Sequence, residues 1–266
     1  MRVALGVLAG LAVLPWLGLR AVPSEPGAAW PSLAHPLGID VLGRDFLGVL
    51  AHGAADFVGP GLLAVLGMVA VIAWRAWFAT ARPVLDAPAE DSGPGWFLLA
   101  APPRLLIVMM AMLLLDEPSP LVAAAVVTAL YLPVALDEIG ARLRELQERQ
   151  VLAGLVAHGL SAPRIVCRHL LGGHLADPVR RHGGMLFVQV AFTQIALAWV
   201  FGASAVTPGL GVSWGMELKR YVAQLPSGAS PCVDGFCPGS IAALHTLLLL
   251  AVCVVLLGGV LRGARR

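Results

Sequence analysis

Apolar residues along the chain fall into six long runs, separated by segments richer in charged residues, glycine and proline. A membrane-spanning helix needs about 17–25 predominantly apolar residues, and each run has that length. The pattern therefore predicts six transmembrane helices, at 3–19, 57–79, 96–115, 119–136, 183–206 and 240–261.

The composition favours a membrane protein over a soluble one. Hydrophobic residues make up 58% of the 266 residues, charged residues 13%, and the mean hydropathy is +0.83. A soluble domain of this size would lack the polar residues that its surface needs. We therefore expect an all-α integral membrane protein without a separate soluble domain. Its parts are an N-terminal helix (1–22), an external loop (23–56) and a five-helix portion (57–266).

The distribution of basic residues predicts the orientation. If the N-terminus is cytoplasmic and the six spans alternate, thirteen arginines lie on the cytoplasmic side and four basic residues lie outside, with Arg104 at the edge of the third span. Cytoplasmic loops carry such an excess, so both termini are predicted to be cytoplasmic. No basic patch indicates a nucleic-acid partner. Residues 1–20 also fit a cleaved signal peptide, which would leave the remaining topology unchanged.

The long cytoplasmic loop 137–182 has a helical pattern. Apolar or small residues recur on one face from Asp137, and Gln150 fills one missing position on that face. Gly159 is predicted to end this helix, Ser161 to cap a second one over 164–171, and Gly172-Gly173 to end that one. The segment is either a solvated surface helix or a docking element for a cytoplasmic partner. The residues on the face are Ile139, Leu143, Leu146, Ala153 and Ala157.

Two external segments carry most of the polar residues outside the cytoplasmic loop. The segment 35–45 holds two glycines, a proline, two aspartates and an arginine, which predicts a tight, hydrogen-bonded loop. The external loop 207–239 contains Cys232 and Cys237. These two cysteines form either a disulfide in an oxidising compartment or a pair of free thiols.

Polar side chains inside the predicted spans have two interpretations. They hydrogen-bond neighbouring helices, or they line a translocation path for a polar solute. His52 and Asp56 are four residues apart and could pair before the second span. No metal site is expected: His169, His174 and His182 are solvated histidines in the favoured interpretation and metal ligands in the weaker one. The polar residues inside the spans are Thr128, Tyr131, Gln189, Thr193 and Gln194.

The segment His35-Pro-Leu-Gly-Ile-Asp-Val-Leu-Gly-Arg-Asp45 resembles the H-P-L-G-T-D-x-L-G-R-D signature of the C-type permease subunits of dipeptide/oligopeptide/nickel ABC transporters. Ser213-Trp-Gly-Met-Glu-Leu218 is similar to the S-W-G-x-x-L of that family, and the C-terminal Gly258–Arg262 to its G-x-x-L-R. The matching positions of the first signature are His35, Pro36, Leu37, Gly38, Asp40, Leu42, Gly43, Arg44 and Asp45.

The resemblance implies a type I importer permease of the bacterial plasma (inner) membrane. Such a subunit pairs with a second permease and two ATPase subunits, and an external substrate-binding protein delivers peptides or nickel. ATP and Mg²⁺ would bind the ATPase partner, so this chain is expected to hold no cofactor and to be no enzyme. No G-x-x-x-x-G-K-[ST] phosphate loop is present.

The resemblance also implies a coupling helix between the fourth and fifth spans, which docks on the ATPase. The matching residues are Gly159, Ser161, Arg164, Ile165, Arg168 and His169. Ala153-Gly154-Leu155 stands where the family has E-A-A, Gly172-Gly173 replaces P-N, and Thr193-Gln194 replaces T-E. These departures leave an alternative open, a degenerate permease that acts as a non-transporting membrane scaffold.

Overall fold

A computed structural model describes residues 2–17, 29–81, 104–114, 119–201, 212–225 and 238–265. Within these ranges the chain is helical and forms no strand, apart from isolated bridges that Ile39 makes with Ala29 and Asp45. The elements are α1 (Arg2–Val13), η1 (Leu14–Leu17), α2 (Phe46–Ala81), α4 (Arg104–Leu113), α5 (Pro120–Glu148), α6 (Val151–Ala157), α7 (Ala162–Arg164), the π-helix η2 (Ile165–His174), α8 (Ala176–Phe201), α9 (Trp214–Gln224) and α10 (Pro238–Arg265).

Four of these helices are long and apolar enough to cross a membrane, namely α2, α5, α8 and α10. They cover the predicted spans 57–79 and 240–261, the predicted span 119–136 from Pro120 onward, and the described part of 183–206, so four of the six predicted spans coincide with helices of the length and composition that a span needs. In the described residues α1 has 12 residues and α4 has 10, which is shorter than a membrane span. The spans at 3–19 and 96–115, and the orientation of the termini, stay predictions.

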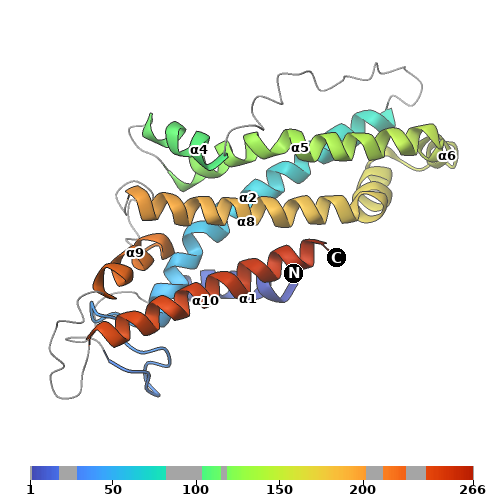
Figure 1. Ribbon diagram of the computed structural model, residues 1–266. Coiled ribbons are helices and arrows are strands. Elements are labelled where there is room, and N and C mark those ends of the chain that lie inside the picture. The colour runs from blue at the N-terminus through green and yellow to red at the C-terminus, as the bar shows by residue number, and fades with distance from the viewer. Residues whose placement is uncertain are drawn as a thin grey trace.

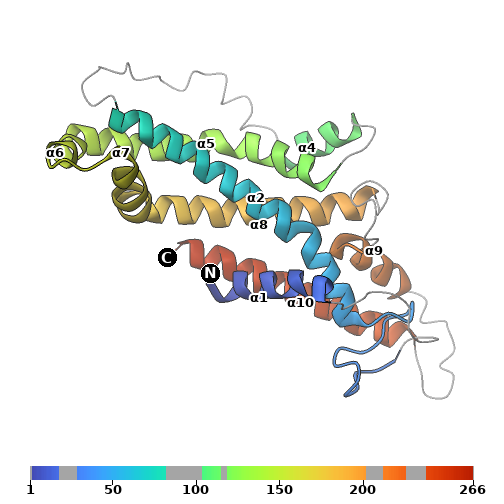
Figure 2. The same ribbon diagram turned by 180° about the vertical axis from the view of Figure 1, so that it is seen from behind.

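The two central helices of the bundle are α2 and α8. The helix α2 runs obliquely through the bundle and packs against α1, α5 and α8, while α8 also contacts α9 and α10 (Figure 1). Its 36 residues give α2 a length of about 54 Å, at 1.5 Å per residue. The N-terminus of α1 and the C-terminus of α10 lie side by side, as the reverse view also shows (Figure 2).

Two apolar cores divide the bundle, and α2 contributes to both. Its first half packs with α1, α9 and α10 through residues such as Phe46 and Phe57. Its second half packs with α5, η2 and α8 through Met68, Ile72 and Ala76. One helix therefore fixes the position of both ends of the molecule.

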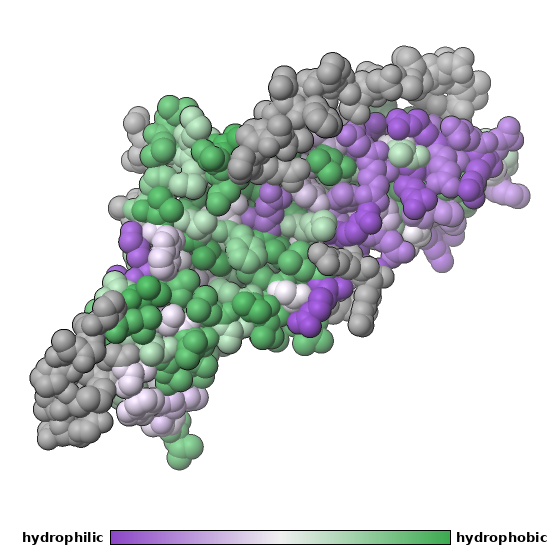
Figure 3. Space-filling view, viewed as in Figure 1, coloured by the Kyte–Doolittle hydropathy of each residue, from purple (hydrophilic) through white to green (hydrophobic). Residues whose placement is uncertain are grey.

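The surface matches a bundle that is surrounded by lipid. Figure 3 shows hydrophobic residues over the middle of one face, across α4, α8 and α10, while hydrophilic residues gather at the end formed by α6 and the C-terminal part of α5. Largely exposed leucines and valines such as Leu247 (66%) and Val254 (70%) lie on α10. Exposing such side chains to lipid hydrocarbon carries no free-energy penalty, whereas exposing them to water would favour aggregation.

The start of α9 packs on α2 at Gly53, where the α2 backbone lies directly against the ring of Trp214. The indole of Trp214 donates a hydrogen bond to the carbonyl oxygen of Leu50 at 3.0 Å and contacts the edge of Phe57. A Cβ atom at position 53 would overlap the Trp214 ring. The absence of a side chain at Gly53 is therefore what allows the two helices to meet.

Gly53→Ala should lower the free energy of unfolding by about 1–3 kcal/mol, because the added methyl group forces Trp214 out of its site. The matched control is Gly67→Ala in the same helix, where nothing lies within 4 Å of the new Cβ. The control should change stability by less than about 1 kcal/mol. Thermal unfolding in detergent measures both, and equal effects would contradict the packing described.

Candidate functional site

The segment 29–45 forms the tight loop that its sequence predicts. The Asp40 N–H donates to the carbonyl oxygen of Arg44 at 2.8 Å, and the Gly43 N–H donates to that of Asp40 at 2.9 Å. One carboxylate oxygen of Asp40 accepts the N–H groups of Leu42 and Arg44, both at 2.9 Å. Gly38 has a φ of +82°, a left-handed conformation that favours glycine. The loop is therefore held by its own backbone and by Asp40.

A buried ionic cluster joins this loop to α9. We call it the Arg44 cluster, and its residues are Asp40, Arg44, Glu217, Arg220 and Tyr221. Arg44 donates to Asp40 through Nε at 2.9 Å and Nη2 at 2.6 Å, and to Glu217 through Nη1 at 3.1 Å and Nη2 at 2.6 Å. Arg220 donates to Glu217 at 2.8 Å and the Tyr221 hydroxyl to Asp40 at 3.1 Å. Two carboxylates and two guanidinium groups thus balance their charges.

The charges of the cluster are stabilised by one another. Asp40, Glu217 and Tyr221 are fully buried and Arg44 is 5% exposed. Burial alone would lower the pKa of Arg44, but the hydrogen bonds and charges of Glu217 and Asp40 outweigh it and raise that pKa above its ordinary value. The pKa of the Tyr221 hydroxyl is raised by burial and then by the charges of Asp40 and Glu217, so Tyr221 remains a donor.

Two further contacts attach the loop to α2 and α10. Asp45 accepts a hydrogen bond from His35 Nδ1 at 3.0 Å through one oxygen and from the Leu47 N–H at 2.9 Å through the other, so it caps the start of α2. His245 of α10 donates from Nε2 to the carbonyl oxygen of Leu37 at 3.1 Å, and its ring stacks on Phe46. The loop, α2, α9 and α10 therefore form one connected end of the bundle.

The predicted coupling residues lie at the opposite end, in the segment 149–175. Ala153, Gly159, Ser161, Arg164 and Arg168 are exposed, and His169 is half-buried. Ile165 is fully buried and packs in the same core as α5 and α8. Gly159 has a φ of +74° and ends the turn after α6, as predicted. The segment thus has an anchored apolar side and an exposed basic side.

Two details of this segment differ from the sequence prediction. The predicted continuous helix from Asp137 is wrong, because Gln150 takes a left-handed conformation (φ 55°) and separates α5 from α6. Leu152 is buried next to this break, while Ala153 and Ala157 of the predicted apolar face are exposed.

The predicted end of the second helix at Gly172-Gly173 is also wrong. The π-helix η2 runs through both glycines to His174, and after the single turn residue Leu175 the chain enters α8. Leu170 and Leu175 are fully buried on either side of the glycines, and this packing overrides the tendency of glycine to end a helix. The segment 149–175 is consequently joined to α8 without a flexible loop.

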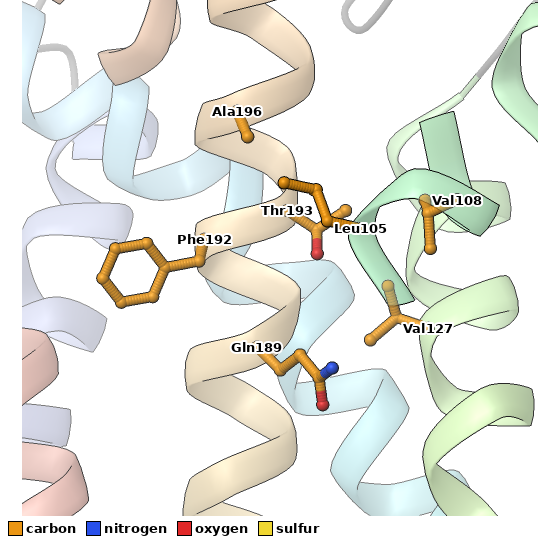
Figure 4. Close-up of a pocket in the computed structure, with 7 residues that line it drawn as sticks. All are labelled: Leu105, Val108, Val127, Gln189, Phe192, Thr193 and Ala196. Atoms are coloured by element: carbon orange, nitrogen blue, oxygen red, sulfur yellow. The ribbon is translucent and has the colours of Figure 1, made fainter. Parts of the chain in front are cut away.

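The five polar residues predicted inside the spans fall into two groups. Gln189 and Thr193 extend from α8 towards α4 and α5 and line a cavity of about 210 Å³ with five apolar residues (Figure 4). Thr128, Tyr131 and Gln194 instead hydrogen-bond to protein groups. Thr128 donates to the Ala124 carbonyl oxygen, and Gln194 donates to that of Pro120 across the helix interface at 2.6 Å. Of the five predicted pathway residues, Gln189 and Thr193 are thus the two that line the cavity, and a pathway role for any of them stays a prediction.

Tyr131 belongs to a polar network between α5 and α8. Its hydroxyl lies 2.8 Å from Nδ1 of His182, whose Nε2 lies 3.0 Å from Glu138, and Arg181 pairs with the same carboxylate. His182 is 5% exposed, so it is not the solvated histidine that the sequence suggested. His52 does not pair with Asp56, because neither carboxylate oxygen of Asp56 has a hydrogen-bond partner, and Nδ1 of His52 donates to the Gly48 carbonyl oxygen at 2.9 Å.

Several polar contacts at the two ends of the bundle could not be predicted from the sequence. Glu217 lies within the recognised S-W-G-x-x-L segment, yet its ion pair with Arg44 spans 173 positions and no local pattern indicates it. The same holds for Glu138 with His182. Cys232 and Cys237 lie outside the described residues. Within the described ranges, no three His, Cys, Asp or Glu side chains converge as metal ligands would.

Two comparisons with known proteins were negative. No protein-family model matches the sequence, and no curated protein matches it.

Arg44→Lys should lower the free energy of unfolding by about 1.5–3 kcal/mol, since an ammonium group cannot donate bidentately to both Asp40 and Glu217. Arg142→Lys is the control, because Arg142 pairs with Glu145 at an exposed site (59% exposed) and should change stability by less than about 1 kcal/mol. Chemical denaturation in detergent compares the two variants. A stability of Arg44→Lys equal to that of the control would contradict a buried ionic cluster.

Proposed function

We propose that this chain is the membrane-spanning permease subunit of an ATP-driven importer. The observation that carries the proposal is the contact between Arg44 and Glu217. Arg44 is a signature residue of the 35–45 segment, Glu217 stands at a variable position of the 213–218 segment, and each segment separately resembles a permease signature. If the two segments serve one structural role in a permease, they must contact each other in the fold, and here they meet in one buried cluster.

In this proposal the chain crosses the bacterial plasma membrane six times, with both termini in the cytoplasm. The four long apolar helices and the hydrophobic middle of the surface support a multi-pass membrane protein (Figure 3). The end that carries the Arg44 cluster would face outward, where a substrate-binding protein docks. The end with the exposed arginines of the segment 149–175 would face the cytoplasm.

The segment 149–175 would dock on an ATPase subunit. Its exposed side carries Arg164 and Arg168, and its buried side is anchored through Ile165. Because η2 leads into α8 across one turn residue, a displacement of this segment would move α8 as one body. The helix α8 bears Gln189 and Thr193, so ATPase motion would reach the cavity directly.

The cavity beside α8 would form part of the translocation path of one permease half, completed by a second permease subunit. Its polar groups are an amide and a hydroxyl, and none of the described residues that line it is charged. Such a surface suits a solute with peptide-like polar groups, which hydrogen-bond to neutral donors and acceptors. Peptides, or a related small solute such as a nickel complex, are the proposed cargo.

A second candidate is a degenerate permease that serves as a membrane scaffold. The observation that favours it is that Ala153-Gly154-Leu155, of which Ala153 and Gly154 are exposed, offers no carboxylate where the permease family has a glutamate. A scaffold would keep the Arg44 cluster and lose the ATPase.

Purification of the tagged chain from its native membranes in mild detergent, followed by native mass spectrometry, tests the proposal. The expected assembly contains this chain, a second permease and two ATPase subunits. Gly159→Ala should reduce ATPase retention, because alanine disfavours the left-handed conformation by about 1–2 kcal/mol. Gly154→Ala is the matched control: position 154 is also exposed and open, but in an ordinary helical conformation.

Recovery of this chain alone or as a homo-oligomer, without an ATPase at any salt concentration, would contradict the importer and favour the scaffold. Equal ATPase retention by both glycine variants would contradict the role of the turn at Gly159.

A further inference from the structure

Asp56 is a buried acid of α2 for which the described part of the chain supplies no partner. Its side chain belongs to a residue only 8% exposed, and neither carboxylate oxygen takes part in a hydrogen bond. Among the described residues no basic side chain forms an ion pair with it, whereas the acids of the Arg44 cluster and of the His182 network each have one.

The neighbours of Asp56 on its own helix supply acceptors rather than donors. His52, one turn earlier, donates from Nδ1 to the Gly48 carbonyl oxygen, so in the neutral ring Nε2 carries no proton. Pro60, one turn later, has no N–H for the carbonyl oxygen of Asp56. The carboxyl and carbonyl oxygens of Asp56 are thus acceptors that lack the usual helix and side-chain donors.

The elements packed against α2 do not compensate for this. The titratable side chains described on α5 and α8 begin at Tyr131, which bonds to His182, and otherwise lie near the opposite end of the bundle, and the described side chains of α1 include none. At the end of α2 that holds Asp56, the facing groups are those of α9 and α10, and most are engaged in the Arg44 cluster or its surroundings. These groups are Glu217, Lys219, Arg220, Tyr221 and His245, and none of them bonds to Asp56.

An ionised carboxylate is strongly disfavoured in such a place, because neither water nor a donor stabilises its charge. We propose that Asp56 is a proton-binding site inside the membrane span, with the carboxyl protonated in the conformation shown. Release of the proton requires water or a cationic group to reach the carboxylate. Asp56 would thus bind and release a proton as its surroundings change. This proposal does not depend on whether the chain couples to an ATPase.

Infrared spectroscopy of the purified full chain tests the site without a transport assay. At neutral pH, the wild-type minus Asp56→Asn difference spectrum should show the carbonyl band of a protonated carboxyl group, and that band should shift in D₂O. The wild-type minus Asp177→Asn spectrum should show carboxylate bands alone, because Asp177 is 83% exposed and paired with Arg180.

Carboxylate bands in the Asp56 difference spectrum would overturn the proposal, because the group would then be ionised. A protonated band that does not shift in D₂O would also overturn it, because a proton that never exchanges is structural. If Asp56→Asn does not fold, dicyclohexylcarbodiimide, which reacts with protonated carboxyl groups in apolar surroundings, is applied to the wild-type chain. Peptide mapping should then find the adduct on Asp56, and an unmodified Asp56 would overturn the proposal.

Discussion

The buried guanidinium of Arg44 is the interaction on which one end of this protein depends. It bonds to Asp40 within its own loop and to Glu217, 173 positions later in the chain. Each of the three groups would be costly to bury alone, and together they neutralise one another. Because Asp45 caps α2 and His245 holds Leu37, the same loop also positions two spans. The polar loop thereby fixes α2, α9 and α10 relative to one another, which apolar contact in lipid alone would not do.

The polar interactions of the bundle are concentrated towards its two ends, and α2 and α8 connect them. The Arg44 cluster closes one end, and the network of Tyr131, His182 and Glu138 ties α5 to α8 towards the other. Between them lie apolar packing, a cavity with neutral polar groups and the buried acid Asp56. Two fixed ends joined by a continuous η2–α8 segment suit a protein that transmits motion along α8, as the proposed permease would.

The sequence predicts the helical class and four of the spans, because a 20-residue apolar run has few alternatives in lipid. It also predicts the tight loop at 35–45 and the turn at Gly159, where glycine and aspartate act locally. It fails at Gly172-Gly173, where burial of Leu170 and Leu175 overrides local preference. The Arg44–Glu217 pair could not be predicted, since no local pattern encodes which distant charges meet.

A double-mutant cycle on Arg44→Gln and Glu217→Gln tests the central claim most directly. The free energy of unfolding in detergent is measured for the wild type, both single variants and the double variant. The account predicts that the double variant loses at least about 1 kcal/mol less than the sum of the single losses, because the two side chains stabilise each other. Strictly additive losses would contradict a direct interaction between the two signature segments, and with it the observation that supports a permease.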